Sequence, residues 1–518
     1  MTREGARLRD DRSAPARPAT SRQAWVALVA STLAFTVCVA AWLGNGVLVT
    51  FLDASGAMPL SRMHISWLVG APVLTGALLR LPVGMLADRY GGRIVFTILM
   101  LLAAAALYLT SFAKGYGDLL LGSLAFGSAG ASFAVGVSFV SRWFPPARQG
   151  AVLGIFGTGN AGTALTAAFG PMLLGYLTAQ GTALEGWRGF PRVYGALLVL
   201  TALTFFAITR EPRGGALAAR PLLVRLAPLR NGHVWRYGLY YFVTFGGYVA
   251  LSQWLISYYV NVYALSLAAA GIMVSLFSLP SAAIRIVGGW LSDRLTPLRV
   301  LRWALGLSVV VLVTLFPPRM DISTPGPGVS ALRGGTVTSV SEDSIGIGAD
   351  LYPYATARVQ TRVALGLGGM EEPATLLPRS TLVQEPTVAV GEQVSAGQLV
   401  VKGTTHIYFQ ANVYFLTGLV VLLGLLMGIG SGAVFAHIPL AFPTEVGTVG
   451  GIVGVLGALG GSVMPVVFGY ALSGSGIWTS NWVTLFMLAL AAFVVLLTGG
   501  RRDRNAKSPT AVDPDALQ

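Results

Sequence analysis

The sequence predicts an all-α polytopic membrane protein. It would have twelve transmembrane helices in two pseudo-symmetric six-helix bundles, with a small β-rich extracytoplasmic insert between helices nine and ten. Of 518 residues, 54% are apolar and only 11% are charged, whereas soluble domains carry about 25% charged residues. Apolar stretches of about 20 residues, long enough to cross a bilayer, recur along the chain. A charged motif also recurs six helices apart. A water-soluble enzyme is thereby excluded, and the single cysteine, Cys38, excludes a disulfide scaffold.

Twelve apolar segments define the expected helices. The first is too long for a cleavable signal peptide and lacks a clear cleavage site. The segments run approximately over residues 25–50, 65–87, 94–112, 119–142, 151–177, 193–208, 237–259, 268–291, 300–317, 413–441, 448–472 and 482–497. The chain then divides into an N-terminal tail (1–24), a first bundle (25–209), a linker (210–236), helices seven to nine (237–317), the insert (318–410), helices ten to twelve (411–499) and a C-terminal tail (500–518).

The net charge of +14 is concentrated in arginines between the helices. Basic residues mark the cytoplasmic side of short loops, so their positions orient the chain and do not indicate nucleic-acid binding. We expect a multi-pass protein of the plasma (inner) membrane, with both termini and the linker in the cytoplasm. The orienting arginines include Arg3, Arg7, Arg9, Arg89, Arg93, Arg142, Arg148, Arg210, Arg213, Arg220, Arg225, Arg230, Arg236, Arg294, Arg299, Arg302, Arg501, Arg502 and Arg504.

An internal repeat relates the two halves. Gly84-Met-Leu-Ala-Asp88-Arg89 follows the second apolar segment, and Gly289-Trp-Leu-Ser-Asp293-Arg294 follows the eighth. Both match G-x-x-x-D-R at equivalent places, which predicts two related six-helix halves joined by the basic linker.

The insert at 318–410 is too long for a simple connection and contains no continuous apolar span. Alternating runs at 335–340 and 357–363 favour strands. The stretch 388–403 resembles the hairpin of biotinyl/lipoyl-like half-barrels, but no methionine-flanked lysine is present, so we expect no attached cofactor. The insert follows an odd-numbered helix, and its acidic residues slightly outnumber its basic ones. We therefore expect it on the outer face of the membrane. A disordered linker is the alternative.

Two arginines are the clear cases of a charge well inside the apolar segments, Arg80 in the second and Arg285 in the eighth. Each lies eight residues before the repeated aspartate, Asp88 or Asp293, a rise of about 12 Å along a helix. Buried charges in membrane helices are costly and are candidates for function. The alternatives are snorkelling to the surface and pairing with buried acids, but these segments contain almost no aspartate or glutamate. Because an anion between two guanidinium groups removes much of this cost, the pair predicts a small-anion site.

Glycine-rich stretches in the fifth and eleventh segments form a second pair six helices apart. Most of these glycines are expected to allow close helix packing, and their exposed backbone can also approach a small ligand. Asn160 adds an amide to an otherwise apolar helix, where an interhelical hydrogen bond is the alternative role. The signature glycines are Gly157, Gly159, Gly162, Gly451, Gly454, Gly457, Gly460 and Gly461.

The loop motif GMLADRYGGR resembles that of the major facilitator superfamily of secondary transporters, and the paired glycine stretches are similar to signatures of its nitrate/nitrite porter family. The resemblance implies that the planar anion binds Arg80 and Arg285, with Asn160, Phe133 and Tyr241 also lining the site. It further implies a cytoplasmic gate formed by five loop residues, which are Asp88, Arg89, Arg93, Asp293 and Arg294.

The expected function is alternating-access transport of nitrate or nitrite by a monomer without cofactors. The scarcity of titratable groups in the helices favours nitrate/nitrite exchange, although proton-coupled uptake remains open through His437 or Glu445. The alternatives are transport of another small anion, such as a phosphate ester, or a transporter-like receptor that senses through the insert. An enzyme is not expected, because the four histidines are scattered and no metal-ligand cluster or activated nucleophile is evident.

Overall fold

The structure, a computed structural model, describes residues 21–180, 185–211, 227–317, 320–354, 379–409, 411–442 and 446–506. Several expected features lie outside these residues. They are Glu445, the linker at 212–226, the arginines of residues 1–20 and the predicted strand at 357–363.

Helices form the body of the molecule, and several of the expected spans consist of two or three consecutive helical elements. The α-helices are α1 (Ser21–Leu43), α2 (Asn45–Ser55), α3 (Arg62–Tyr90), α4 (Gly92–Thr110), α5 (Tyr116–Phe126), α6 (Ser132–Ser141), α7 (Pro146–Gly157), α8 (Gly162–Gln180), α9 (Gly189–Ile208), α11 (Gly232–Tyr241), α12 (Gly247–Tyr263), α13 (Leu267–Ala283), α14 (Arg285–Leu295), α15 (Pro297–Thr314), α16 (Val413–Ala441), α17 (Val446–Ser475) and α18 (Ser480–Ala506). Shorter helical turns are η1 (Gly127–Ala131), η2 (Thr158–Ala161), η3 (Gly186–Arg188), η4 (Ala227–Arg230) and the π-helical η5 (Phe242–Gly246).

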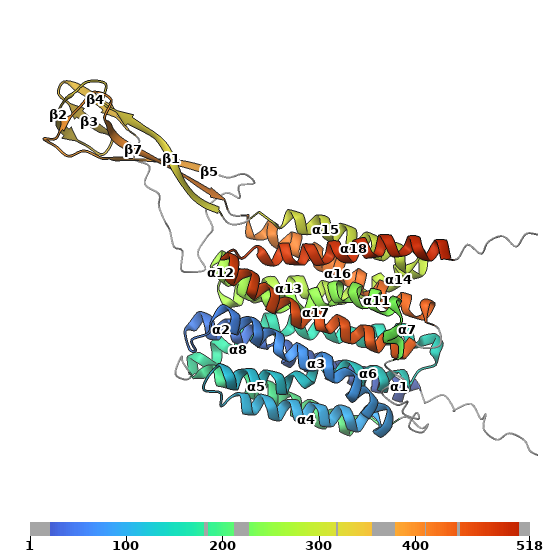
Figure 1. The fold of residues 1–518 in the computed structure, drawn as a ribbon. Helices are drawn as coiled ribbons and strands as arrows, with labels where there is room; N and C mark the ends of the chain where they lie inside the picture. Colours follow the sequence, from blue (N-terminus) through green and yellow to red (C-terminus); the bar gives the residue numbers. More distant parts are fainter. Residues whose placement is uncertain are drawn as a thin grey trace, which may run out of the picture.

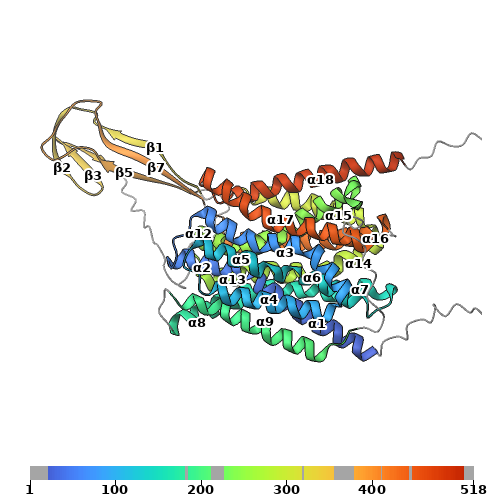
Figure 2. The ribbon, with the colours of Figure 1, turned by 60° about the horizontal axis from the view of Figure 1, so that its bottom comes forward.

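These helices run side by side across the body (Figures 1 and 2). Within the described residues, eleven helical segments are long and apolar enough to cross a membrane. The expected seventh span is the continuous series α11, η5 and α12, over Gly232–Tyr263. The π-turn in its middle is notable because such turns occur frequently at functional sites.

Polar caps begin the helices where the sequence supplies an oxygen for free N–H groups. The Ser61 hydroxyl accepts from the His64 backbone N–H at 3.1 Å at the start of α3. The Asn412 side chain accepts from Tyr414 N–H at 2.8 Å at the start of α16. α3 continues through Pro72 and Pro82, because surrounding helices can satisfy backbone groups that proline leaves free.

The β-rich insert follows α15 and precedes α16. Its strands are β1 (Met320–Ser330), β2 (Gly335–Val340), β3 (Ser344–Ile347), β4 (Asp350–Pro353), β5 (Arg379–Pro386), β6 (Gln393–Val394) and β7 (Leu399–Phe409). They form a three-stranded sheet in the order β1-β7-β5 and a four-stranded sheet in the order β4-β3-β2-β6. The expected β-rich insert is therefore present. The alternative of a disordered linker is wrong for the described part.

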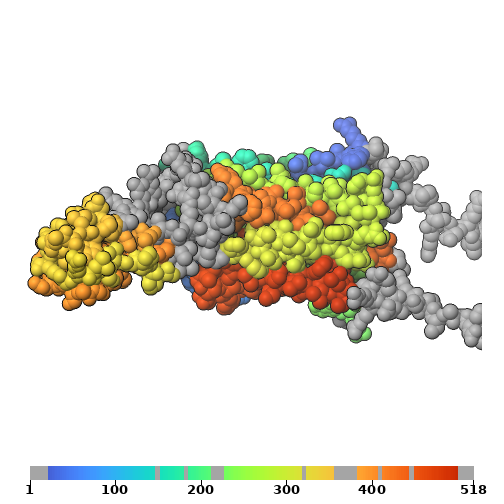
Figure 3. Space-filling view, turned by 90° about the horizontal axis from the view of Figure 1, so that it is seen from above, coloured from blue at the N-terminus to red at the C-terminus, as the bar shows by residue number. Residues whose placement is uncertain are grey.

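Antiparallel pairing sets the shape of the insert. Met320 pairs with Phe409 at the base, and the β1–β7 ladder continues to Ser330 and Leu399. Val337, Ile345 and Val400 lie in a separate small core. The insert projects beyond the helices, at the end opposite to the start of α1 and the end of α18 (Figures 1 and 3).

A candidate anion site between the two halves

Arg80 lies inside the protein, in the middle of α3, with 6% of its surface exposed. Its NH1 donates a hydrogen bond to the backbone carbonyl of Gly454 in α17, at 2.8 Å. Its Nε donates to the carbonyl of Gly130 in η1, at 3.4 Å. Because α3 belongs to the first half and α17 to the second, the Arg80 side chain joins the halves.

Arg285 begins α14, directly after the break that separates it from α13. Its Nε and NH2 are buried and make no hydrogen bond within the described part of the chain. The Tyr241 side chain forms a hydrogen bond with Arg285. It also interacts electrostatically with both Arg285 and Arg80. Burying a guanidinium donor without an acceptor is costly, so Arg285 has unused capacity to bind an anion.

One aromatic ring, that of Phe245, lies close to both guanidinium groups. The Phe245 ring centroid is 5.6 Å from Arg80 Cζ and 4.8 Å from Arg285 Cζ. The Tyr241 ring stacks on Phe245 at 4.9 Å. Phe133 lies 5.4 Å from Arg80 Cζ, and Tyr248 lies 5.2 Å from Arg285 Cζ. The rings partly stabilise the cations and exclude water.

Phe245 was not among the residues predicted from the sequence. It lies in the π-turn η5 of an aromatic-rich segment, where one phenylalanine looks like any other packing residue. Only the fold places its ring close to two arginines that are 205 positions apart in the sequence.

The glycines of α17 allow its close approach to the site. The position where a Gly457 Cβ would stand is filled by the Tyr241 ring. A Cβ on Gly454 would have Arg80 NH1 as its nearest neighbour, at 3.9 Å. Gly460 approaches Phe242, Gly461 approaches Val249, and Gly451 faces Leu81. Most of the glycines therefore pack against neighbouring elements, while the Gly454 carbonyl contacts a functional side chain.

The glycine stretch that ends α7 and includes η2 lies beside the first half's own helices and α13. Gly159 packs on Phe35, and Gly162 packs on the Thr36 carbonyl. A Cβ added at Gly157 would have no atom of a neighbouring element within 4 Å. Asn160 is buried, and its Nδ2 donates to the Gly157 carbonyl at 2.8 Å. Its amide thus bonds within its own helical segment.

The loop between α3 and α4 has contacts that organise the first half. Asp88 accepts a hydrogen bond from Ser138 in α6, at 2.6 Å. Arg93 donates to the Phe206 carbonyl at 2.6 Å, through its NH2. Glu211 accepts from the Gly92 and Arg93 backbone N–H groups at 3.1 and 3.0 Å. This acceptor at the start of α4 could not be predicted from the motif alone.

Other charged loop residues contact neighbouring rings or solvent. Glu211 also forms an ion pair with Arg142 at 3.0 Å. Arg89 Cζ lies 5.2 Å from the Tyr90 ring, and Arg294 Cζ lies 4.3 Å from the Trp290 ring. Asp293 is exposed.

On the insert side of the arginines, the two halves pack tightly. Ser275 in α13 donates to the Ala164 carbonyl in α8, at 2.5 Å. Gly70 in α3 is so close to α17 that a Cβ would lie 2.7 Å from the Ser462 carbonyl. Gly154 and Gly289, on the other side of the arginines, have open space beside them. Ser275 and Gly70 therefore join the two halves on the side that carries the insert.

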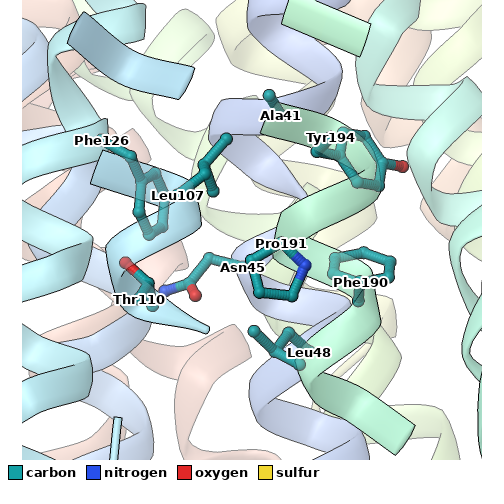
Figure 4. Close-up of a pocket in the computed structure, with 9 residues that line it drawn as sticks. All are labelled: Ala41, Asn45, Leu48, Leu107, Thr110, Phe126, Phe190, Pro191 and Tyr194. Carbon is teal, nitrogen blue, oxygen red and sulfur yellow. The ribbon is translucent and has the colours of Figure 1, made fainter. Parts of the chain in front are cut away.

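A small cavity lies apart from the arginines, within the first half (Figure 4). Its volume is about 10 Å³, enough for about one water molecule. It is lined by Ala41, Asn45, Leu48, Leu107, Thr110, Phe126, Phe190, Pro191 and Tyr194. Its size excludes it as the binding site for a transported anion.

The central arrangement therefore consists of the buried Arg80 side chain, the partly buried Arg285 side chain and four aromatic rings. Among the described residues, no carboxylate forms an ion pair with either arginine, and no group of histidine, cysteine, aspartate or glutamate could hold a metal ion. Helices from both halves meet there, as expected for a transporter that alternates between two openings.

The fold and this central site define a secondary transporter of the major facilitator superfamily, and the chain belongs to that superfamily. The family model described as Major Facilitator Superfamily matches residues 24–351. Within it, the chain belongs with the nitrate/nitrite porters, as its relatives indicate. The family expected from the loop motif and the glycine stretches is thus confirmed.

Two relatives match along most of their length. The chain is 37% identical, over 484 residues, to a probable nitrate/nitrite antiporter, NarK1, of Thermus thermophilus, covering 92% of this chain and 91% of that protein. It is 26% identical, over 439 residues, to the nitrite extrusion protein of Bacillus subtilis, covering 85% of each.

A third relative matches over a shorter range. It is the probable nitrate/nitrite transporter NarK2 of Mycobacterium tuberculosis, 34% identical over 270 residues, which cover 51% of this chain and 66% of that protein. These relatives are transporters, which agrees with the prediction that the protein is not an enzyme.

Solved structures share the fold. A bacterial homologue of the human lysosomal transporter Spinster, in an inward-facing and occupied conformation, matches with a TM-score of 0.60 and 16% identity, over 93% of this chain and 98% of that chain. The human organic anion transporter MFSD10 matches with a TM-score of 0.55 and 15% identity, over 91% and 99%. Together with the family match, they confirm the predicted fold class.

Proposed function

We propose that this protein transports nitrate and nitrite across the membrane, with the anion bound between Arg80 and Arg285. The observation that carries this proposal is the pair of buried Arg285 donors without an acceptor, close to a second buried cation. An anion that enters the site satisfies the donors and offsets the repulsion between the guanidinium groups. The names of the Thermus and Bacillus relatives support nitrate and nitrite as the anions.

The surroundings favour a small, flat anion with a single charge. A guanidinium presents a planar fork of donors that matches a planar oxyanion. The rings of Phe133, Tyr241, Phe245 and Tyr248 lie near the arginines in the described part of the chain. A phosphate ester would bring more charge and bulk, for which this ring of aromatic groups offers few additional donors. Asn160 and the signature glycines are included in the proposed site because they position its helices and its donors.

The transport cycle is alternating access, in which the two halves rock around the arginines. In this conformation, the contacts of Ser275 and Gly70 close the side that carries the insert. The gate on the opposite side comprises Asp88, Arg89 and Arg93, together with Asp293 and Arg294. The protein works as a monomer, since one chain supplies both arginines.

The arginine-rich side faces the cytoplasm of a cell whose plasma membrane holds the protein, with both termini inside and the insert outside. The start of α1 and the end of α18 lie at the same end of the body, opposite the insert (Figure 1), which supports this orientation.

Nitrate/nitrite exchange is the favoured mode of coupling. Proton symport usually requires a titratable group within the membrane, and among the described residues no carboxylate pairs with the arginines. His437, at 5.1 Å from the Tyr237 ring, is the described candidate for proton coupling. Uptake of labelled nitrate into liposomes loaded with nitrite, compared with uptake driven by a pH gradient alone, separates the two modes.

The experiment that tests the function is a proteoliposome uptake panel with nitrate, nitrite, chlorate and phosphate. We expect saturable uptake of nitrate and nitrite, competition by chlorate, which is another small monovalent oxyanion, and little effect of phosphate. Phosphate uptake without nitrate uptake would overturn the proposal and favour another anion as substrate.

A further inference from the structure

A row of polar residues follows one face of α12. Gln253, Ser257 and Asn261 are spaced by four residues, which places them on the same side of a helix. Gln253 follows Phe245 of the proposed site by eight residues, about 12 Å along the helix. Asn261 is exposed near the end of α12, which lies on the side of the body that carries the insert (Figure 1). The polar row therefore leads from the arginines toward that side.

The Gln253 side chain is buried, with 1% of its surface exposed. Neither its Nε2 nor its Oε1 makes a hydrogen bond within the part of the chain that the structure describes. The amide of Asn261, in contrast, donates to the Ser257 carbonyl at 2.9 Å. Burial of an amide without a partner is costly, and most buried polar groups in native proteins do have partners. Gln253 therefore has unused donors and a costly position in this conformation.

Gln253 lies at the boundary between the two halves. α12 of the second half packs against α2 of the first. A Cβ added at Gly46 in α2 would lie 3.0 Å from the Gln253 Cβ, so the Gln253 side chain leaves its helix on the face that meets α2. One turn closer to the arginines, Val249 of α12 and Val73 of α3 both lie beside Gly461. The first half therefore covers this face of α12, and separation of the halves on this side would uncover the amide.

We propose that Gln253 binds the transported anion when the halves part on the side that carries the insert, as the anion moves between that side and the arginines. This inference rests on the proposed function and deepens it, because it adds a ligand for the same anion in the opposite conformation. The anion gives the Gln253 amide the partner that it lacks while the halves are closed over it.

A neutral amide suits this part of the pathway. Its nitrogen carries two N–H donors, and a neutral donor forms weaker hydrogen bonds to an oxyanion than a charged guanidinium does. The anion can therefore pass between Gln253 and the arginines without being trapped on the way, as a conducting pathway requires. Ser257, buried one turn further from the arginines, adds a hydroxyl on the same face of the helix.

The test is the initial rate of labelled nitrate uptake into membrane vesicles that are loaded with nitrite and have the insert facing the medium. The vesicles contain the full-length wild type, Gln253→Glu or Gln253→Asn. At neutral pH an exposed glutamate is ionised, so Gln253→Glu keeps the shape of the side chain but loses the donors and repels an anion. We expect its KM for nitrate to rise roughly tenfold or more.

The rival explanation is that Gln253 acts only through the cost of its burial and never contacts the anion. A buried carboxylate is costlier than a buried amide, so Gln253→Glu would then favour opening toward the insert and lower the KM. Gln253→Asn separates the explanations again, because it keeps a buried amide but shortens its reach by one methylene. Contact with the anion predicts a severalfold rise in KM, whereas burial alone predicts the wild-type KM. A lower KM in Gln253→Glu would overturn the inference. If Gln253→Glu does not insert, Gln253→Asn decides, and a wild-type KM there would overturn it.

The matched control is Asn481→Asp. The Asn481 amide is also 1% exposed and has no hydrogen-bond partner among the described residues, but it lies in α18, which packs against α15 and α17 of its own half. Its KM should match that of the wild type, and a rise equal to that of Gln253→Glu would overturn the inference. A wild type that takes up neither nitrate nor nitrite would overturn the proposed function. Normal uptake by the wild type with an unchanged KM in Gln253→Glu would overturn the inference alone.

Discussion

Arg80 in α3 donates a hydrogen bond of 2.8 Å to the backbone carbonyl of Gly454 in α17. This bond joins the two halves of the protein at the depth of the proposed anion site. It explains why a glycine-rich helix faces an arginine-bearing helix: only a backbone without bulky side chains allows the guanidinium to reach the carbonyl. In the proposed cycle, the same side chain would therefore couple anion binding to movement of the halves.

Gly457→Ala should impair transport, because the new methyl group would occupy the position of the Tyr241 ring. Overpacking of this kind costs about 1–3 kcal/mol, and here it also displaces a ring of the site. We expect nitrate uptake in proteoliposomes to fall severalfold. Gly454→Ala is the matched control, since its methyl group would meet Arg80 NH1 only at 3.9 Å, and it should retain most of its uptake. Equal activity of both variants would contradict this account of helix α17.

Phe245→Leu should weaken nitrate binding, because it removes the ring that contacts both guanidinium groups. Cation–π contacts in desolvated sites contribute about 2 kcal/mol, so we expect an increase in the apparent KM of roughly tenfold or more. Phe206→Leu is the control. It removes a ring 3.9 Å from Arg93 Cζ but leaves the proposed site intact, so its KM should match that of the wild type. An unchanged KM in Phe245→Leu would exclude the ring from the site.

Ser275→Ala should destabilise the conformation that is closed toward the insert, because it removes the hydrogen bond to the Ala164 carbonyl. The single native cysteine, Cys38, is buried, so a cysteine introduced as Gly154→Cys can report opening of the other side. We expect thiol labelling of that cysteine to slow when Ser275→Ala is added. Ser278→Ala, which loses only a bond to Val274 within its own helix, should leave labelling unchanged. Faster labelling in Ser275→Ala would reverse the assigned direction of closure.

Replacement of residues 320–409 by a short flexible linker should preserve nitrate uptake. Met320 and Phe409 are paired at the base of the insert, and α15 packs against α16, so a few residues can join the helices. The comparison is made between equal amounts of folded, reconstituted protein. Loss of uptake with normal folding would instead favour a receptor that senses through the insert.

The sequence was sufficient to predict the helical fold and to single out Arg80 and Arg285, because charges inside apolar segments are rare and easily seen. It could not predict that the Phe245 ring lies close to both arginines, since this depends on the π-turn η5. It could not predict that Glu211 caps α4, because that contact joins residues more than 100 positions apart. The prediction for Asn160 named an anion ligand or an interhelical bond, whereas the structure gives its amide a partner within its own helix.

The central claim is that Arg80 and Arg285 together bind the transported anion. The most direct test is uptake of labelled nitrate by proteoliposomes containing the wild type, Arg80→Lys, Arg285→Lys or the exposed control Arg302→Lys, at equal membrane insertion. Lysine keeps the charge but lacks the planar fork of donors. The account predicts that the first two variants lose nearly all nitrate uptake and that Arg302→Lys retains it; wild-type flux in either Arg80→Lys or Arg285→Lys would contradict the proposed site.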